Sequence, residues 1–242
     1  MKDYLLDLIQ YTHGLGCINT VKIEGTDAET KISAAAADLV VITGEFKQPV
    51  ADFIGTFGMP NLSTLKTIVN FEEYGEGATI ELRRGREDDP TSPESIHFEN
   101  KTGDFINDYR LMAKATVNGV LPPVTFRGAA WDISFEPTND NISRLKKQAN
   151  ASSEETNFKF KVENGDLKVY FGEHYSHSGN FVFQSNVSGN LSKARDYPVK
   201  IFLSVVELAG NKKISISDAG VIKITVDSGL ADYQYLIPAL AK

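Results

Sequence analysis

Most of the chain alternates apolar and polar residues with a period of two, and turn residues bound the alternating stretches. This pattern predicts half-buried β-strands. Residues 20–34 and 157–171 each predict a strand, a turn and a second strand, and Asn164 and Gly165 are typical of a tight hairpin turn. Further strands are expected at residues 79–84, 95–100, 106–113, 129–137, 180–187, 213–218, 221–227 and 233–237.

Four stretches instead place apolar residues at helical spacing. The first lies near the start of the chain, where Leu5, Leu8 and Ile9 share one face. The other three stretches cover residues 60–73, 139–152 and 197–210. Their apolar stripes are Leu62, Leu65, Ile68 and Val69; Ile142, Leu145 and Ala149; and Phe202, Val205, Val206 and Ala209.

The order of these elements repeats. Leu5 and Leu8 recur as Ile142 and Leu145 at a spacing of 137 residues, and a proline precedes the second helix of each half. A shared spacing predicts two copies of one helix–strands–helix–strands unit. Chance alignment of amphipathic segments is the alternative.

The boundary between the copies is expected where prolines and glycine interrupt regular structure. We predict a first domain at residues 1–116, a connector at residues 117–124 and a second domain at residues 125–242. Two helices packed across an antiparallel sheet are the economical arrangement for each copy, so the predicted fold class is α+β.

Positive charge gathers on the predicted helices, although the net charge of the chain is −7. On three of the four helices, or just beside them, cations project from the side opposite the apolar stripe. These cations are Lys66, Arg144, Lys146, Lys147, Lys193, Arg195 and Lys200. The first helix differs, because it carries Asp3 and Asp7 beside Lys2. Cationic faces without base-reading motifs predict contact with the phosphates of double-stranded DNA, independent of sequence. Ordinary solvated helix faces are the alternative.

Little in the sequence suggests catalysis. No Gly-rich phosphate loop and no zinc-ligand spacing occur, and His174 and His177 are the nearest approach to a metal site. We therefore expect a protein that is not an enzyme and that has no catalytic residues, metal or cofactor. Because Cys17 is the only cysteine and no apolar run approaches the ~20 residues of a membrane span, we expect an intracellular protein without membrane contact.

Three stretches resemble a known family: "FGMPNLSTLKTIVN", "HFENKTGDFINDYRLM" and "ISDAGVIKITVDSGLADYQYLIPA". The chain resembles DNA sliding clamps, the processivity factors of replicative DNA polymerases, most closely those of T4-like tailed bacteriophages. The resemblance implies a homotrimeric ring of repeated clamp domains, with helices lining a hole for duplex DNA and sheets forming the outer wall. It also implies a DNA polymerase and a clamp-loader ATPase as partners, in the cytoplasm of an infected bacterial host. The acidic first helix departs from the family pattern.

The same resemblance implies two protein-binding surfaces. Subunits would join through edge strands near Tyr109, Leu111, Phe181 and Phe183. Partner peptides would dock in a pocket bordered by Val120, Leu121, Pro122, Leu236, Ile237 and Pro238. A last strand that only seals its own core is the alternative for the closing residues.

Two other functions compete with the clamp. A β-rich phage structural or assembly protein would also be rich in strands, but repeated helices with cationic outer faces do not follow from that role. A carbohydrate-active enzyme would need paired carboxylates and aromatic platforms, and the single tryptophan, Trp131, lies inside a strand pattern.

Overall fold

The structure is a computed structural model that describes residues 1–85, 91–122, 128–172 and 177–240. The chain forms two compact units, which we describe separately. The first unit comprises Met1–Ala36, Ile42–Val124 and Ser228–Tyr233, and the second comprises Ala37–Val41, Thr125–Asp227 and Gln234–Lys242. No helix in the described ranges is long and apolar enough to cross a membrane.

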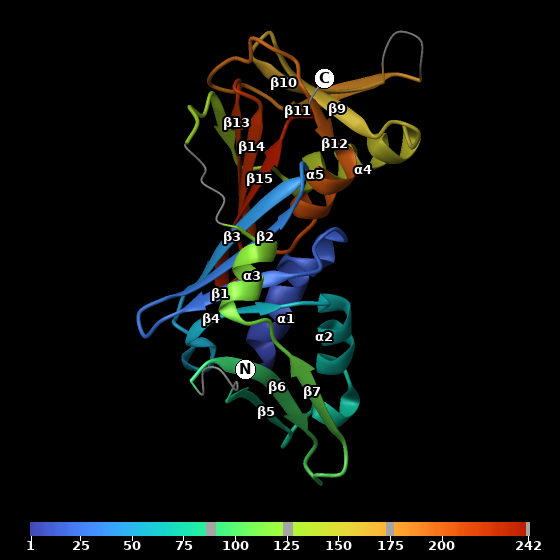
Figure 1. Cartoon of the computed structure of the whole chain (residues 1–242). Helices are drawn as coiled ribbons and strands as arrows, with labels where there is room; N and C mark the ends of the chain where they lie inside the picture. Colours follow the sequence, from blue (N-terminus) through green and yellow to red (C-terminus); the bar gives the residue numbers. More distant parts are fainter. Residues whose placement is uncertain (86–90, 123–127, 173–176, 241–242) are drawn as a thin grey trace. The chain divides into compact units, whose positions relative to one another are not determined.

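The first unit combines helices with antiparallel sheets (Figure 1). Its helices are α1 (Lys2–Tyr11), α2 (Leu62–Val69) and the short α3 (Lys114–Val120), with single 3-10 turns at His13–Leu15, Ala51–Phe53 and Glu72–Tyr74. Its strands are β1 (Val21–Gly25), β2 (Thr30–Ala36), β3 (Val40–Phe46), β4 (Gly55–Met59), β5 (Thr79–Arg84), β6 (Pro93–Glu99) and β7 (Ile106–Arg110). They are ordered β4-β1-β2-β3 and β5-β6-β7, and the first residues of β15 (Ala231–Pro238) lie next to β3.

The core of the first unit is built by the predicted apolar stripes. Leu5 and Leu8 of α1 and Leu62 and Leu65 of α2 have no exposed surface. The two helices pack against each other, which is why both apolar faces can be buried at once. Tyr233 of β15 completes this core, stacking on Tyr11 with ring centroids 5.0 Å apart.

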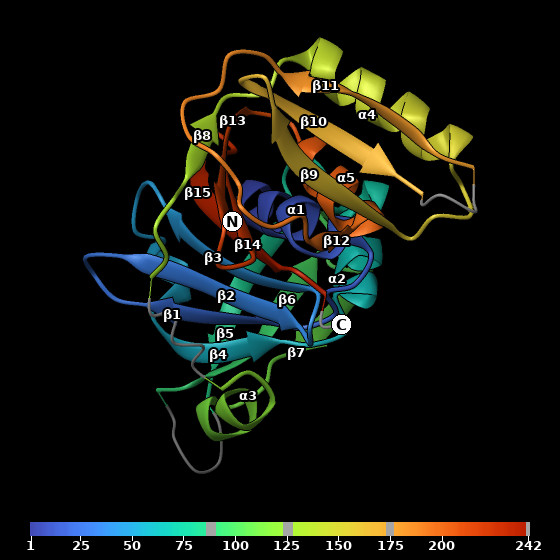
Figure 2. The same cartoon turned by 90° about the horizontal axis from the view of Figure 1, so that it is seen from above.

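The second unit repeats the same order of elements. It contains β8 (Ile133–Phe135), α4 (Asn139–Ala151), β9 (Asn157–Glu163), β10 (Asp166–Phe171), β11 (Gly179–Gln184), β12 (Asp196–Pro198), α5 (Val199–Val206), β13 (Asn211–Ser217) and β14 (Val221–Asp227), together with the end of β15. Its strands are ordered β11-β10-β9-β12 and β15-β14-β13-β8. Helix α4 runs along β11 and contacts α5 (Figure 2).

The hairpin between β9 and β10 turns as its sequence predicts. Asn164 and Gly165 both have positive φ, 55° and 82°, the conformation that a two-residue turn requires. The core behind this hairpin is aromatic: Phe202 of α5 lies 5.0 Å from Phe158 and 5.7 Å from Phe160, measured between ring centroids. The α+β fold class is thereby confirmed.

One helix contradicts the sequence interpretation. The region around Gly119 and Pro122 was expected to lack regular structure, yet α3 forms at Lys114–Val120. The cause is tertiary packing, because Val117 is fully buried against β4. A Cβ on Gly58 of β4 would lie 2.7 Å from Cγ2 of Val117, so only glycine allows this approach. Residues 123 and 124 of the predicted connector lie outside the described residues.

The acidic character of the first helix also needs correction. Asp3 is exposed, but Asp7 lies on the buried face and is 8% exposed. Its carboxylate accepts a hydrogen bond from the hydroxyl of Tyr233 at 2.8 Å. The Nζ of Lys2 donates to the carbonyl oxygen of Tyr74 at 2.7 Å. The helix therefore presents less negative charge to solvent than its sequence suggests.

Candidate nucleic-acid interface and peptide pocket

Helix α4 carries the densest group of candidate phosphate-binding cations. Thr138 caps the helix, accepting a hydrogen bond from the backbone N–H of Asn141, and Leu145 turns the helix toward the core. Arg144, Lys146 and Lys147 are consequently exposed on the other side. The sequence predicted this cationic face, but within the predicted apolar stripe Leu145 is buried whereas Ile142 and Ala149 are half-buried.

The three cations of α4 have different surroundings. The guanidinium of Arg144 lies 5.1 Å from the ring centroid of Phe181 on β11, and Nζ of Lys146 pairs with Glu207 at 2.7 Å. Lys147 has no ion pair among the described residues. Its charge is therefore the most available of the three for an external anion.

Two further candidate cations are isolated on their helices. Lys66 of α2 and Lys200 of α5 are exposed, while the apolar stripe of α2 and Phe202, Val205 and Val206 of α5 are buried; Ala209, predicted as part of the second stripe, is exposed and lies beyond the end of α5. In the part of the chain that the structure describes, neither lysine side chain makes an ion pair. They can contribute long-range attraction to phosphates, screened by salt.

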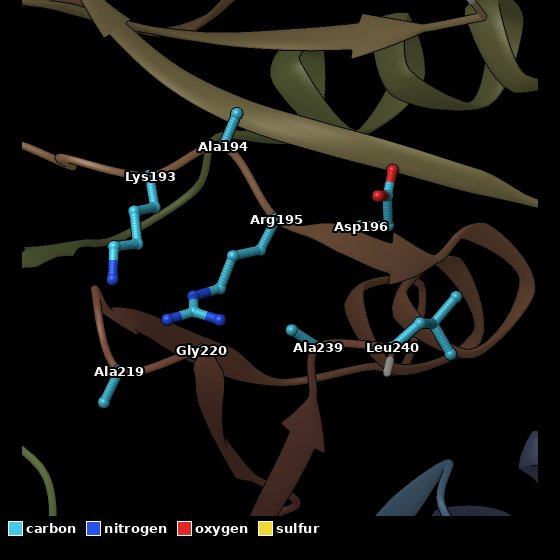
Figure 3. A pocket seen from close by; sticks show the side chains of 8 residues that line it. All are labelled: Lys193, Ala194, Arg195, Asp196, Ala219, Gly220, Ala239 and Leu240. Carbon is cyan, nitrogen blue, oxygen red and sulfur yellow. The ribbon is translucent and has the colours of Figure 1, made fainter. Parts of the chain in front are cut away.

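Lys193 and Arg195 lie in a pocket rather than on a helix face (Figure 3). The pocket, of about 600 Å³, belongs wholly to the second unit. Its lining consists of Lys193, Ala194, Arg195, Asp196, Ala219, Gly220, Ala239 and Leu240. The sequence analysis grouped both cations with Lys200 because of their proximity along the chain, and nothing in that spacing showed that they lie beside the turn between β13 and β14.

Arg195 stabilises the turn between β13 and β14 through hydrogen bonds. Its Nε and Nη2 atoms donate to the carbonyl oxygen of Asp218 at 3.1 and 3.0 Å. Gly220 has a φ of +95°, and a Cβ there would lie 2.9 Å from Cδ of Arg195. Glycine is therefore needed at this position both for the turn and for the close approach of the arginine.

The closing residues of the described chain form the opposite wall of the pocket. The backbone N–H of Ala239 donates to the carbonyl oxygen of Gly220 at 2.9 Å, and that of Leu240 donates to Asp196 at 2.8 Å. These two bonds hold the segment after β15 in place. The pocket wall is thus fixed by backbone hydrogen bonds.

The residues predicted to border a peptide pocket do not line the pocket of the second unit. In the first unit, Val120 is 52% exposed, Leu121 is half-buried and Pro122 is exposed. In the second unit, Ile237 is fully buried, Leu236 is 6% exposed and Pro238 is half-buried. Tyr235, Leu236 and Ile237 are all buried, and the closing residues that line the pocket of the second unit are Ala239 and Leu240.

Strand β7 ends its sheet, which makes its outer edge a candidate subunit interface. Among the described strands β7 pairs only with β6. Tyr109 and Leu111 are buried in their own unit, and the Tyr109 hydroxyl donates to the carbonyl oxygen of Pro60. Burial raises the pKa of Tyr109. An interface at this edge would use the backbone and outward residues such as Ile106, which is 51% exposed.

Strand β11 is the corresponding edge of the second unit, where β10 is its only described neighbour. Phe183 is fully buried and Phe181 is half-buried beneath Arg144. Val182 lies on the opposite face of the strand, because successive side chains alternate. Each unit therefore ends one of its sheets in a strand with an unused edge among the described residues.

The described residues contain no group of three or more side chains suited to hold a metal ion. Of the histidine pair considered from the sequence, His174 lies outside the described residues.

Known proteins resemble this chain in structure rather than in sequence. No family model matches the sequence, and no curated protein matches it. Solved structures do match along nearly the whole chain. A structure described as the C-terminal region of FEN-1 bound to A. fulgidus PCNA is matched with a TM-score of 0.67 and 12% identity, over 98% of this chain and 96% of that one.

Two further structures agree. Proliferating Cellular Nuclear Antigen from Entamoeba histolytica matches with a TM-score of 0.66 and 10% identity, over 99% of this chain and 94% of that one. PCNA from Thermococcus kodakaraensis matches with a TM-score of 0.65 and 11% identity, over 99% and 95% of the two chains. The chain has the PCNA fold.

The chain and these PCNA structures are alike in fold and not in sequence, because their sequence identity is only 10–12%. The sequence analysis missed the pocket beside Arg195, because a pocket formed by a loop, a turn and a chain end has no periodic signature. Gly220 within "SDAG" was the available signal, since glycine marks positive φ and close approach.

Proposed function

We propose that this protein is a sliding clamp that encircles duplex DNA and tethers a DNA polymerase for processive synthesis. The observation that carries the proposal is the match to PCNA structures over 98–99% of the chain. The clamp acts as a scaffold and not as an enzyme. Its partners are a replicative polymerase and a clamp-loader ATPase, and the resemblance to T4-like phage clamps assigns it to the cytoplasm of an infected bacterium.

We expect ring formation because β7 and β11 each leave one sheet edge unpaired among the described strands. An edge strand exposes unpaired N–H and C=O groups, and pairing with another chain satisfies them. Here β7 of the first unit and β11 of the second provide one edge each. Pairing β7 of one copy with β11 of the next is a heterologous contact, which repeats around a closed ring. A homotrimer gives six units around the hole.

The cations of the helices supply weak attraction to DNA inside the ring. Lys66, Lys147 and Lys200 have exposed charges without described ion pairs. Lysine contacts to phosphate do not distinguish bases, so the ring can move along any sequence. Arg144 and Lys146 contribute beside them, while the structure gives Lys193 and Arg195 a different setting.

Topological binding is the property to test. We would replace Cys17 by serine, place cysteines at Ile106 of β7 and Val182 of β11, and cross-link the copies with a bifunctional maleimide in the presence of nicked circular plasmid. The expected product is a covalently closed trimer that stays with the plasmid during gel filtration in high salt. Cutting the plasmid once should release it, because a closed ring slides off a free end.

The control moves one cysteine off the edge, to Ile54, which is 37% exposed and lies before β4. This variant should give no closed ring. Equal retention on circular and linear plasmid would show ordinary DNA binding and refute the clamp. A protein that stays monomeric at micromolar concentration and gives no cross-linked trimer would refute the ring.

A further inference from the structure

His97 of β6 is a buried titratable residue on the polar face of the sheet β5-β6-β7 in the first unit. Its exposed fraction is 3%, and the register places it between Glu81 of β5 and Asp108 of β7. Its chain neighbours Ile96 and Phe98 are fully buried on the opposite face, in the core. Figure 1 shows these strands, with β7 at the end of the sheet. His97 therefore lies one strand away from the edge proposed for subunit pairing.

Both imidazole nitrogens of His97 face carboxylates. Nδ1 lies 2.9 Å from Oδ1 of Asp108, and Nε2 lies 3.1 Å from Oε2 of Glu99. An ionised carboxylate only accepts hydrogen bonds, and a neutral imidazole has a single N–H. Only a protonated imidazole, with an N–H on each nitrogen, donates to Asp108 and Glu99 at once. The geometry is therefore that of an imidazolium held between two carboxylates.

The charged groups around His97 come from three strands. Arg83 of β5 pairs with Glu81 through Nε at 3.2 Å, and its Nη1 lies 3.8 Å from Oδ1 of Asp108. The imidazole is thus closer to Asp108 than the guanidinium is. β4, which also contacts β6, has no titratable side chain. The charged groups on the face of His97 are Glu81 and Arg83 of β5, Glu99 of β6, and Asp108 and Arg110 of β7, the last paired with Glu94 at 2.7 Å.

The bond to Asp108 links the edge strand to its neighbour. Asp108 and His97 are directly opposite in the register, so their side chains join β7 to β6 in addition to the backbone pairing. Glu99 lies opposite Ile106, the 51% exposed residue of β7. When the imidazole loses its proton, one of its two hydrogen bonds is lost and a nitrogen lone pair points at a carboxylate. The link between the strands then weakens, and negative charge beside the edge increases.

We propose that His97 is a positioning residue for subunit pairing: its protonated imidazole fixes β7 against β6, so that β7 presents a regular edge to β11 of the next copy. The inference rests on the proposed function, because it concerns the edge through which the copies would join. An edge strand pairs through its row of N–H and C=O groups, and a loosened strand presents that row poorly. Histidine generally changes charge between about pH 5 and 8. The copies should therefore associate more weakly as the pH rises through this range.

The first test measures trimer formation by sedimentation equilibrium at constant ionic strength, from about pH 6 to about pH 8.5. For the wild type, the dissociation constant of the subunit contact should rise roughly tenfold, as expected for one lost hydrogen bond to a charged group. His97→Gln carries no charge, so its dissociation constant should stay near the high-pH value of the wild type throughout. His13→Gln is the matched control in the same unit and should keep the pH dependence, because Nδ1 of His13 lies against the carbonyl oxygen of Ile18 and not against a carboxylate.

Asp108→Asn separates this role from simple packing. An amide donates as well as accepts, so a neutral imidazole can bond to it and to Glu99 at the same time. The variant should therefore associate more tightly than the wild type at about pH 8.5, and its dissociation constant should vary much less with pH. If His97 only filled space, Asp108→Asn would not improve association at high pH.

Hydrogen exchange of β7 examines His97 without the ring of subunits. In dilute, monomeric protein, the protection of the Ile106–Arg110 amides, corrected for intrinsic exchange rates, should fall with rising pH in the wild type and vary far less in His97→Gln. A wild type that forms no trimer at any pH would refute the ring of the proposed function, and the exchange data would still decide whether His97 fixes β7. The inference is overturned if protection or association responds to pH equally in the wild type and His97→Gln, or if Asp108→Asn associates no better than the wild type at high pH.

Discussion

Asp7 is a buried carboxylate whose charge should make the stability of the first unit depend on pH. It lies on α1, 8% exposed, and accepts a hydrogen bond from the hydroxyl of Tyr233 at 2.8 Å, with Ser228 nearby. Burial raises the pKa of Asp7, and the two hydroxyls oppose that rise only in part. Desolvation therefore dominates, and the native state favours the protonated acid.

The direction in which the free energy of unfolding changes with pH follows from proton linkage. Because the native pKa exceeds the unfolded value of about 3.9, the folded chain holds a proton that the unfolded chain has released. The stabilising contribution is fully present below the unfolded pKa and is lost as the pH rises through the native pKa. Each unit of difference between the two pKa values corresponds to ~1.4 kcal/mol at pH above both.

Asp7→Asn should remove this dependence while retaining an acceptor for Tyr233. We expect the variant to be at least as stable as the wild type at pH 7, and its advantage to shrink as the pH falls from 7 toward 4. The measurement is urea denaturation followed by circular dichroism at fixed protein concentration, across that pH range. Other carboxylates titrate in both proteins, so the difference between the two curves isolates Asp7.

Two further variants test the hydrogen bonding. Tyr233→Phe removes a bond that lowers the pKa of Asp7, so it should extend the loss of stability to higher pH. Asp7→Ala removes the acceptor of the Tyr233 hydroxyl, at a cost of about 1–3 kcal/mol. A difference between wild type and Asp7→Asn that does not vary with pH, or that grows in favour of the variant toward pH 4, would refute the reasoning.

Two packing predictions concern the remaining elements. Gly58→Val should destabilise the first unit by about 1–3 kcal/mol, since a Cβ at Gly58 would lie 2.7 Å from Val117, whereas Gly119→Ala, which meets nothing within 4 Å, should be tolerated in thermal unfolding. Phe202→Ala should cost about 3–5 kcal/mol in denaturant unfolding, because Phe202 is fully buried among the rings of the second unit. If Gly58→Val or Phe202→Ala proves as stable as the wild type, the packing described around that residue is wrong.

The sequence predicted most of the regular elements because burial repeats with their period, but it missed the short strands β4 and β12. The stripes of α1, α2, α4 and α5 and the turn at Asn164 follow from local patterns that tertiary contacts then reinforce. Helix α3 was missed because its stability comes from Val117 against Gly58, a contact between positions 59 residues apart. Gly119 and Pro122 instead predicted that this region lacks regular structure.

The candidate site was less predictable than the fold. Exposed cations on α4 follow directly from the position of Leu145 on the helix. Asp7 was expected at the surface because acids usually are, and only the distant Tyr233 makes its burial tolerable. Arg195 is held by a hydrogen bond to the carbonyl oxygen of Asp218, which lies 23 residues later in the chain. No short window of sequence reveals such a contact.

The split of β15 between the units also has a consequence for the newly made chain. The first unit includes Ser228–Tyr233, and the hydrogen bond from Tyr233 to Asp7 joins residues 226 positions apart. A ribosome that has translated the whole N-terminal half has therefore not yet supplied the strand that closes that half. Because translation adds roughly 5–20 residues per second, Ser228–Tyr233 is made several seconds after the rest of the first unit. Messages cut short before codon 228 should yield chains in which Tyr11 and Asp7 of α1 lack Tyr233, and chaperones and proteases can recognise this exposed part of the core.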